Sequence, residues 1–487
     1  MEVSRIHKIY VLVVVALGVL AIEWIGLGFG SALWLFALYA AFLVYLHHEG
    51  RPLNKFGLVL SLAPLLLALA NALGFLMLEP VFWLSMPLMM IAAGYVALGT
   101  ARHDYGEPEF LVDVVGGLFY LPFGNLDKLY RSIGAMFASK SGEPSRRKAV
   151  LAGILLAIPV LAIALWLLSG ADLVFGHVLK TAYDNLFEHF GDSLGKLIFG
   201  VALGTLLFST LVGFFHKWPE LESRPRRSLA RETILIVLIP LVLLYVLFVG
   251  AQVYQLVLFQ SSVPAYAEYG AYARAGFFQL VCAAALNLLI LLGSLRSSDE
   301  AFRATRLWKW LSRALCGLTL LLLVCSTIRV CGYISEYGLT ELRINSVWSI
   351  VLMVIALALV TGKLLREQFR LFPALLALAM FGTTGFAYVG SDALIARYNV
   401  EAYLGGHTMS MDLGVIDSEL GDDAMPAVVY LYQALEERGD DQALKLREQA
   451  RKLLLDASEQ ARALRWQDQT LITCLLPAQV ERAIFPQ

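Results

Sequence analysis

The chain has 487 residues, of which 59% are hydrophobic and only 16% are charged. Ordinary soluble domains carry about 25% charged residues, and the mean hydropathy here is +0.69. This composition excludes a soluble, a disordered and a disulfide-stapled protein, and a net charge of -1 excludes a nucleic-acid-binding one. A polytopic, all-α membrane protein remains.

Apolar runs long enough to cross a bilayer recur eleven times along the chain. A hydrocarbon core of about 30 Å needs about 20 residues of helix. The runs predict spans near residues 9–28, 30–46, 57–77, 80–99, 149–169, 197–215, 233–256, 275–295, 314–332, 344–361 and 371–389. The first run contains Glu23 and no small-residue cleavage site follows it, so we interpret it as a span and not as a cleaved signal peptide.

The distribution of basic residues predicts the orientation of these spans. With the N-terminus in the cytoplasm, the inner segments carry 24 Lys and Arg residues and the outer loops carry four. Such a bias marks the cytoplasmic side of a membrane protein. Eleven spans then place the C-terminus outside the cytoplasm.

Residues 390–487 differ in composition from the membrane region, with 16 acidic and nine basic residues. Apolar residues at three- and four-residue spacing predict an amphipathic helix over 440–466. We therefore expect a transmembrane domain over 1–389 and a small, acidic, extracytoplasmic helical domain over 390–487.

Two charged residues lie well inside predicted spans. Glu23 and Arg329 each come late in a span that runs outward, so both are expected in the outer half of the membrane. Charges at that depth are costly and often functional. The two side chains can form a salt bridge that holds two helices together, or they can line a site for a substrate or a proton.

The predicted outer loops are rich in charge and tyrosine. Arg274 lies between the seventh and eighth spans, while Tyr333, Tyr337 and Arg343 surround the connection between the ninth and tenth. Asp172 follows the fifth span. Tyrosines at this depth commonly form an aromatic belt. Together with arginine they also suit an anionic headgroup, a phosphate or a carboxylate.

Motifs for nucleotide binding, nucleophilic catalysis or metal ligation are absent from the sequence. We therefore predict no catalytic residue, no metal and no cofactor, which weakens an enzymatic interpretation. Glu268, Glu336 and Glu341 remain acid–base candidates if the protein acts on a lipid carrier.

Five sequence elements occur in an order that resembles a known family. They are GADLVF (170–175), YARAGFFQL (272–280), RVCGYISEYGLTELR (329–343), SDALIARYNVEAY (391–403) and DLGVIDSELGDDAMPAV (412–428). The order is similar to that in a bacterial family of multispanning membrane proteins whose domain has no known function. Ala271 replaces a more often acidic position, and the tryptophan-rich ending is reduced to 463–469. The resemblance implies a bacterial plasma-membrane protein and no particular chemistry.

These observations favour a transporter-like protein that handles an anionic or amphipathic solute at a site in the outer half of the membrane. Glu23, Arg329, Arg274, Arg343, Tyr333, Tyr337 and Asp172 are the candidate binding or gating residues. The alternative is a non-catalytic sensor, scaffold or assembly subunit. In that case membrane lipids, and an envelope protein bound through residues 390–487, are the expected partners, with no role for nucleic acid.

Overall fold

The computed structural model describes residues 5–24, 26, 28–50, 52–75, 79–126, 192–215, 229–258, 266–406, 411–438 and 441–485. These ranges contain helices, 3-10 turns and connections, and no strand. The predicted all-α class is therefore confirmed. The chain forms two compact units, one of Met1–Glu220 with Asp456–Ala478 and one of Leu221–Leu455 with Gln479–Gln487.

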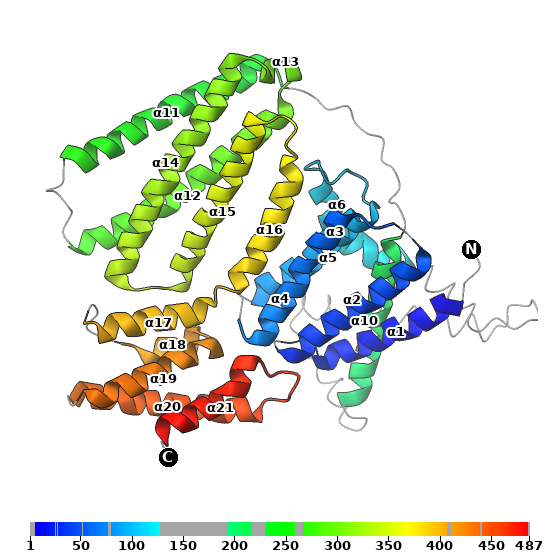
Figure 1. Cartoon of the computed structure of the whole chain (residues 1–487), viewed down its shortest axis with the longest axis vertical. Coiled ribbons are helices and arrows are strands. Elements are labelled where there is room, and N and C mark those ends of the chain that lie inside the picture. The colour runs from blue at the N-terminus through cyan, green and yellow to red at the C-terminus, as the bar shows by residue number, and fades with distance from the viewer. Residues whose placement is uncertain are drawn as a thin grey trace, which may run out of the picture. The chain divides into compact units, whose positions relative to one another are not determined.

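The first unit is a bundle of apolar helices. Its described helices are α1 (Arg5–Trp24), α2 (Phe29–Glu49), α3 (Lys55–Leu60), α4 (Leu62–Leu73), α5 (Glu79–Leu98), α6 (Phe110–Phe123) and α10 (Asp192–Gly213). α1 packs along α10 and against α2, α2 packs on α4, and α3 packs on α5 (Figure 1).

Glycines allow α1 and α10 to approach backbone to backbone. A Cβ atom built at Gly18 would lie 2.2 Å from the backbone nitrogen of Gly204. One built at Gly204 would lie 2.7 Å from the Cα atom of Val15, and one at Gly200 would lie 2.6 Å from that of Val19. Gly200 and Gly204 form the small-xxx-small pattern that brings membrane helices close together.

The second unit is also built from long apolar helices. They are α11 (Arg231–Leu258), α12 (Tyr266–Ser297), α13 (Glu300–Arg303), α14 (Arg306–Tyr337), α15 (Glu341–Leu365) and α16 (Leu371–Ala387). α14 packs against α11, α12 and α15, and α15 packs on α16 (Figure 1). Leu315 and Leu322 of α14 are buried in the resulting core.

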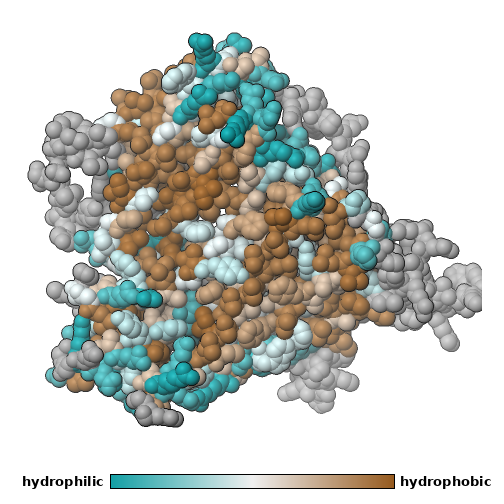
Figure 2. All heavy atoms as spheres, in the orientation of Figure 1, coloured by the Kyte–Doolittle hydropathy of each residue, from teal (hydrophilic) through white to brown (hydrophobic). Residues whose placement is uncertain are grey.

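The outer faces of these helices expose many large apolar side chains, whose contact with water would be unfavourable. On α11, Ile236 is 72% exposed and Leu247 is 73% exposed. In the second unit, hydrophobic residues cover the middle of α11–α16 and hydrophilic residues gather at its two ends (Figure 2). A broad apolar surface between polar ends is expected of a protein that is solvated by lipid.

Eight helices in the described ranges are long and apolar enough to cross a membrane. Each of them overlaps one predicted span. A ninth is possible if α16 and α17 (Ser391–Leu404), which are bent by 50°, form one broken span. The first predicted span corresponds to a shorter apolar helix, Tyr10–Trp24, and the span predicted at 149–169 lies outside the described residues.

Two local expectations about the connections are wrong. α12 begins at Tyr266 and α14 continues to Tyr337, so much of what was expected as outer loop is helical. α6 lies in a segment expected to be a cytoplasmic loop. Its apolar run of 14 residues is shorter than a span and therefore escaped a search for spanning lengths.

The C-terminal residues are helical. They form α17, α18 (Leu413–Glu419), η1 (Asp422–Ala424), α19 (Met425–Ala434), η2 (Leu435–Glu437), α20 (Asp441–Ala463) and α21 (Leu471–Ile484). α20 lies within the predicted amphipathic helix. Because Asp456–Ala478 groups with the first unit and the rest of the tail with the second, a separate domain over 390–487 is not confirmed.

Candidate functional site

A pocket of about 240 Å³ lies where the α14–α15 connection meets α17 and α18. All of its walls belong to the second unit. The pocket is lined by Tyr337, Gly338, Leu339, Thr340, Glu341, Ile395, Asn399, Met411, Asp412, Val415, Ile416, Glu419 and Leu420. These residues come from the α14–α15 connection and from two segments of the chain, 395–399 and 411–420, that lie more than 50 positions further on.

Gly338 and Asn399 fix the wall of the pocket made by the α14–α15 connection. α14 ends at Gly338, whose φ of 76° favours glycine. A Cβ atom at this position would lie 2.6 Å from Oδ1 of Asn399. The Asn399 amide accepts a hydrogen bond from the Leu339 backbone nitrogen at 2.9 Å and donates one to its carbonyl oxygen at 2.9 Å. Asn399 therefore fastens the connection to α17.

Arg343 also stabilises the connection between α14 and α15. Its guanidinium donates to the backbone carbonyls of Tyr337 and Gly338. It also lies over the ring of Tyr333, 4.2 Å from the ring centre. Lone carbonyls at a helix C-terminus are satisfied in this way. The contacts of Arg343 thus hold the end of α14 in place, and its role as a binding or gating residue stays a prediction.

The opposite wall is held by two aspartates. Asp412 caps α18 by accepting from the Gly414 nitrogen at 2.9 Å. Asp392, at the start of α17, accepts from the Gly421 nitrogen at 2.9 Å just beyond α18. α18 is therefore tied at both ends, and it presents Val415, Ile416 and Glu419 to the pocket.

The charged groups that line the pocket are acidic. Glu341, Asp412 and Glu419 contribute three carboxylates, and among the described lining residues there is no lysine, arginine or histidine. Tyr337 is 45% exposed and adds an accessible ring to the apolar part of the wall. Such a pocket suits a ligand that has an apolar body and a positively charged group.

Asp423 is a buried acid close to this wall. It is 1% exposed, and burial, together with the charges of Asp392 and Asp422, raises its pKa to about 7, although the backbone N–H of Ala393 partly offsets this. The folded protein therefore retains a proton that the unfolded chain releases above its ordinary pKa of 3.8. The contribution of Asp423 to stability is therefore fully present below about pH 4 and is lost as the pH rises to about 7.

Asp423→Asn is expected to reduce the loss of folding stability that accompanies a rise in pH. Thermal unfolding of wild-type protein in detergent should show stability falling between pH 4.5 and pH 7.5, by about 3 kcal/mol if Asp423 alone determines it. The variant should lose less stability over this range than wild type, with a remainder from Asp392 and Asp422, whose pKa values burial also raises, and it should be more stable than wild type at pH 7.5. Asp417→Asn, an exposed change on α18, is the control. An equal pH dependence in wild type and Asp423→Asn would contradict the assignment.

Glu23 lies in a second charged cluster, in the first unit. Its carboxylate contacts Nζ of Lys196 at 3.1 Å and Nη1 of Arg465 at 2.9 Å. Arg465 also pairs with Asp468 at 2.8 Å, and Trp24 packs edge-on against Trp466. Glu23 therefore joins α1, α10 and the segment after α20.

Glu23→Gln is expected to loosen this junction without unfolding the bundle. All three charged groups are at least one-third exposed, so the loss should be about 1 kcal/mol. Limited proteolysis near Arg465 and Trp466 is the measurement, and cleavage should be several-fold faster than in wild type. Glu459→Gln, an exposed change on α20, should cleave like wild type. Equal cleavage of both variants would show that the ion pairs do not hold the segment.

The remaining predicted site residues are placed as follows. Arg329 is half-buried on α14 in the second unit, so its pairing with Glu23 of the first unit stays a prediction. Arg274 lies on α12, with its side chain outside the described set, and Asp172 lies outside the described residues. The pocket brings together Tyr337 from the predicted set with Asn399, Asp412 and Glu419, which the search for charges inside spans did not select.

The apolar helices and the polar pocket at the end of the second unit define a multispanning helical membrane protein. A family model described as a domain of unknown function, DUF4153, matches residues 57–431. The chain therefore belongs to this family, and the match includes every residue that lines the pocket. No curated protein and no solved structure matches the chain.

Proposed function

We propose that the protein is a membrane-embedded sensor or assembly subunit that binds an amphipathic, positively charged ligand in the pocket of the second unit. The observation that carries this proposal is the lining, in which the described residues supply three carboxylates and apolar side chains and no basic group. Of the two solute classes predicted, anionic and amphipathic, the lining favours the amphipathic one.

The position of the pocket supports a sensing role. Gly338–Thr340 joins α14 to α15, two helices that are long and apolar enough to cross the membrane. A ligand held between this connection and α18 contacts both the membrane helices and the tail. Differential contact with two arrangements of these elements is what a ligand needs to shift their populations.

The predicted topology indicates on which side of the membrane the ligand would reach the pocket. The distribution of basic residues puts the α14–α15 connection and the tail on the outer side, and the family resemblance implies a bacterial plasma membrane. We infer that the ligand, or the positively charged segment of an envelope protein, reaches the pocket from outside the cytoplasm.

A matched pair of small amphiphiles tests the proposal. Phenethylamine and 3-phenylpropionate carry opposite charges on similar bodies, and calorimetry in lipid nanodiscs measures their binding. Wild type should bind the amine and not the acid. Glu341→Gln with Glu419→Gln should weaken amine binding at least tenfold, whereas Asp417→Asn, which is exposed on α18 but does not line the pocket, should not. Preference for the acid would overturn the proposal.

A transporter-like role is the second candidate, and charges within apolar helices favour it. Glu23 and Lys196 lie on α1 and α10, and Arg329 lies on α14. A transporter places its substrate site near the membrane midplane. Accumulation of labelled phenethylamine in proteoliposomes, lost in Arg329→Leu while the protein remains folded, would move the proposal from sensing to transport.

A further inference from the structure

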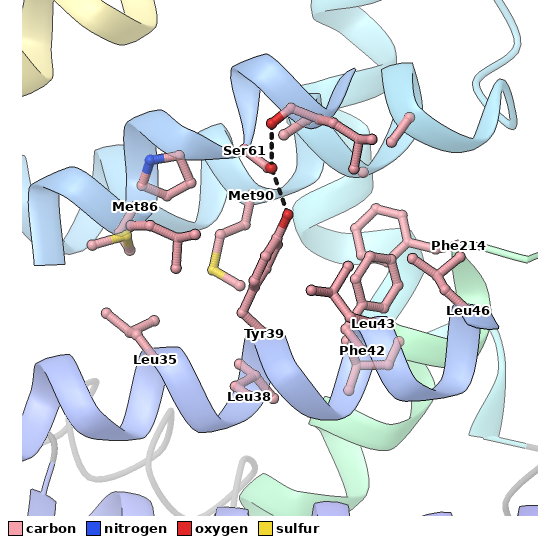
Figure 3. Close-up of a pocket in the computed structure, with 17 residues that line it drawn as sticks. Leu35, Leu38, Tyr39, Phe42, Leu43, Leu46, Ser61, Met86, Met90 and Phe214 are labelled. Carbon is pink, nitrogen blue, oxygen red and sulfur yellow. Dashed lines mark hydrogen bonds between the residues drawn. The ribbon is translucent and has the colours of Figure 1, made fainter. Parts of the chain in front are cut away.

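An apolar pocket lies among the helices of the first unit that are long enough to span the membrane (Figure 3). α2, the α3–α4 segment, α5 and α10 all contribute to its walls, and its volume is about 50 Å³. Leu38, Leu46, Met86 and Phe214 are each at most 5% exposed. Leu43, which also lines the pocket, is 37% exposed, so the wall made by α2 is partly accessible.

The sequence explains why a space remains here. Pro64 has no backbone N–H to donate to Leu60, and the helix is interrupted at Ser61, between α3 and α4. Before the interruption, Gly57 brings α3 against α5, where a Cβ atom would lie 2.2 Å from the nitrogen of Ala97. The pocket lies between this segment and α5, where the flexible side chain of Met90 is part of the lining.

The two hydroxyl groups in the wall do not make the pocket polar. Ser61 donates to the Leu58 carbonyl at 2.7 Å, so the bond of 2.5 Å between Tyr39 and Ser61 uses the Tyr39 hydrogen. Figure 3 shows this relay from Tyr39 through Ser61 to the backbone. Neither hydroxyl has a hydrogen left to donate. A ligand with a carbonyl or phosphate oxygen at this point would therefore gain no hydrogen bond.

We propose that this pocket binds the end of a phospholipid acyl chain that leaves the bilayer and inserts between α2 and α5. Apolar cavities stay free of water and take apolar guests, and a water-sized group needs about 10–15 Å³ by the same measure. The space therefore accepts about three to five chain carbons. The acyl chain is the apolar species that the membrane supplies to a pocket among spanning helices whose α2 wall is partly accessible.

Photo-crosslinking in wild-type protein tests the proposal without any change in sequence. The protein is reconstituted with phosphatidylcholine that carries a diazirine either at the end of one acyl chain or near the glycerol. The chain-end probe should label the α2 and α5 peptides that contain Leu43, Met86 and Met90, at least fivefold more than the glycerol probe. Equal labelling by the two probes, or no labelling of these peptides, would overturn the proposal.

Three variants distinguish a bound chain end from other occupants. Met90→Trp fills the pocket and should lower chain-end labelling at least fivefold, whereas Leu84→Trp, a change at a position that is 60% exposed on the same helix, should not. Tyr39→Phe should label like wild type. A loss of labelling in Tyr39→Phe would mean that a polar headgroup reaches the hydroxyls, and would overturn the assignment.

Competition identifies the source of the chain. Unlabelled phosphatidylcholine should reduce labelling in proportion to its dilution of the probe. If a polyprenyl phosphate at low mole fraction abolishes labelling instead, the pocket belongs to a lipid carrier and the proposal is wrong.

Discussion

Gly204→Leu is expected to yield little folded protein. A side chain at this position begins 2.7 Å from the Cα atom of Val15, so α1 and α10 must separate before the leucine fits. Separation removes the close backbone packing around Gly18 and Gly200. The expected loss is at least about 3 kcal/mol, and fluorescence-detected size-exclusion chromatography with a thermal ramp measures it.

Gly317→Leu provides a matched control for this prediction. Gly317 also lies in a long apolar helix, α14, but a Cβ atom there would meet no atom within 4 Å. This variant should elute and melt like wild type. If Gly204→Leu behaves in the same way, the close contact between α1 and α10 is not a feature of the folded protein.

Asn399→Leu is expected to abolish binding of phenethylamine at the pocket. The change removes both hydrogen bonds to the Leu339 backbone and leaves that N–H and C=O without their partner. Each lost partner costs about 1–3 kcal/mol, and 1.4 kcal/mol already corresponds to a tenfold weaker affinity. Calorimetry should therefore show at least a tenfold loss of affinity.

Two further substitutions on α17 separate a local effect from general destabilisation. Arg397 is 73% exposed and pairs with the exposed Glu401 one turn along the same helix, so Arg397→Leu should bind like wild type. Asn399→Asp can still accept from the Leu339 nitrogen but cannot donate to its carbonyl oxygen, and it should give an intermediate affinity. Equal affinities for Asn399→Leu and Arg397→Leu would show that the α14–α15 connection does not shape the site.

The helical membrane class could be predicted from the sequence because long apolar runs have few alternatives to spanning a bilayer. The same criterion missed α6, a largely apolar helix whose 14 residues are fewer than a span requires. The criterion of apolar length also placed the ends of the eighth and ninth predicted spans where the apolar runs end. α12 and α14 continue beyond the apolar runs, because helix formation does not stop where hydropathy falls.

The candidate site was less accessible to sequence reasoning. The partner of Glu23 on the tail, Arg465, lies 442 positions away, and no pattern in a single sequence connects the two. Matching charges by depth paired Glu23 with Arg329 because depth is the only coordinate that hydropathy supplies. The sequence elements that carried the family resemblance indicated the position of the pocket better than the charges inside spans did. Three of them, 329–343, 391–403 and 412–428, contain nearly all the residues that line the pocket.

Accessibility of one cysteine in the pocket tests the central proposal most directly. Val415 lines the pocket and is 43% exposed, so Val415→Cys, in a chain whose five native cysteines are replaced, can be labelled in intact cells by a membrane-impermeant thiol reagent. We predict rapid labelling from outside that phenethylamine slows and 3-phenylpropionate does not. Labelling that occurs only after the cells are opened, or that both compounds leave unchanged, would contradict an outward-facing pocket for a positively charged amphipathic ligand.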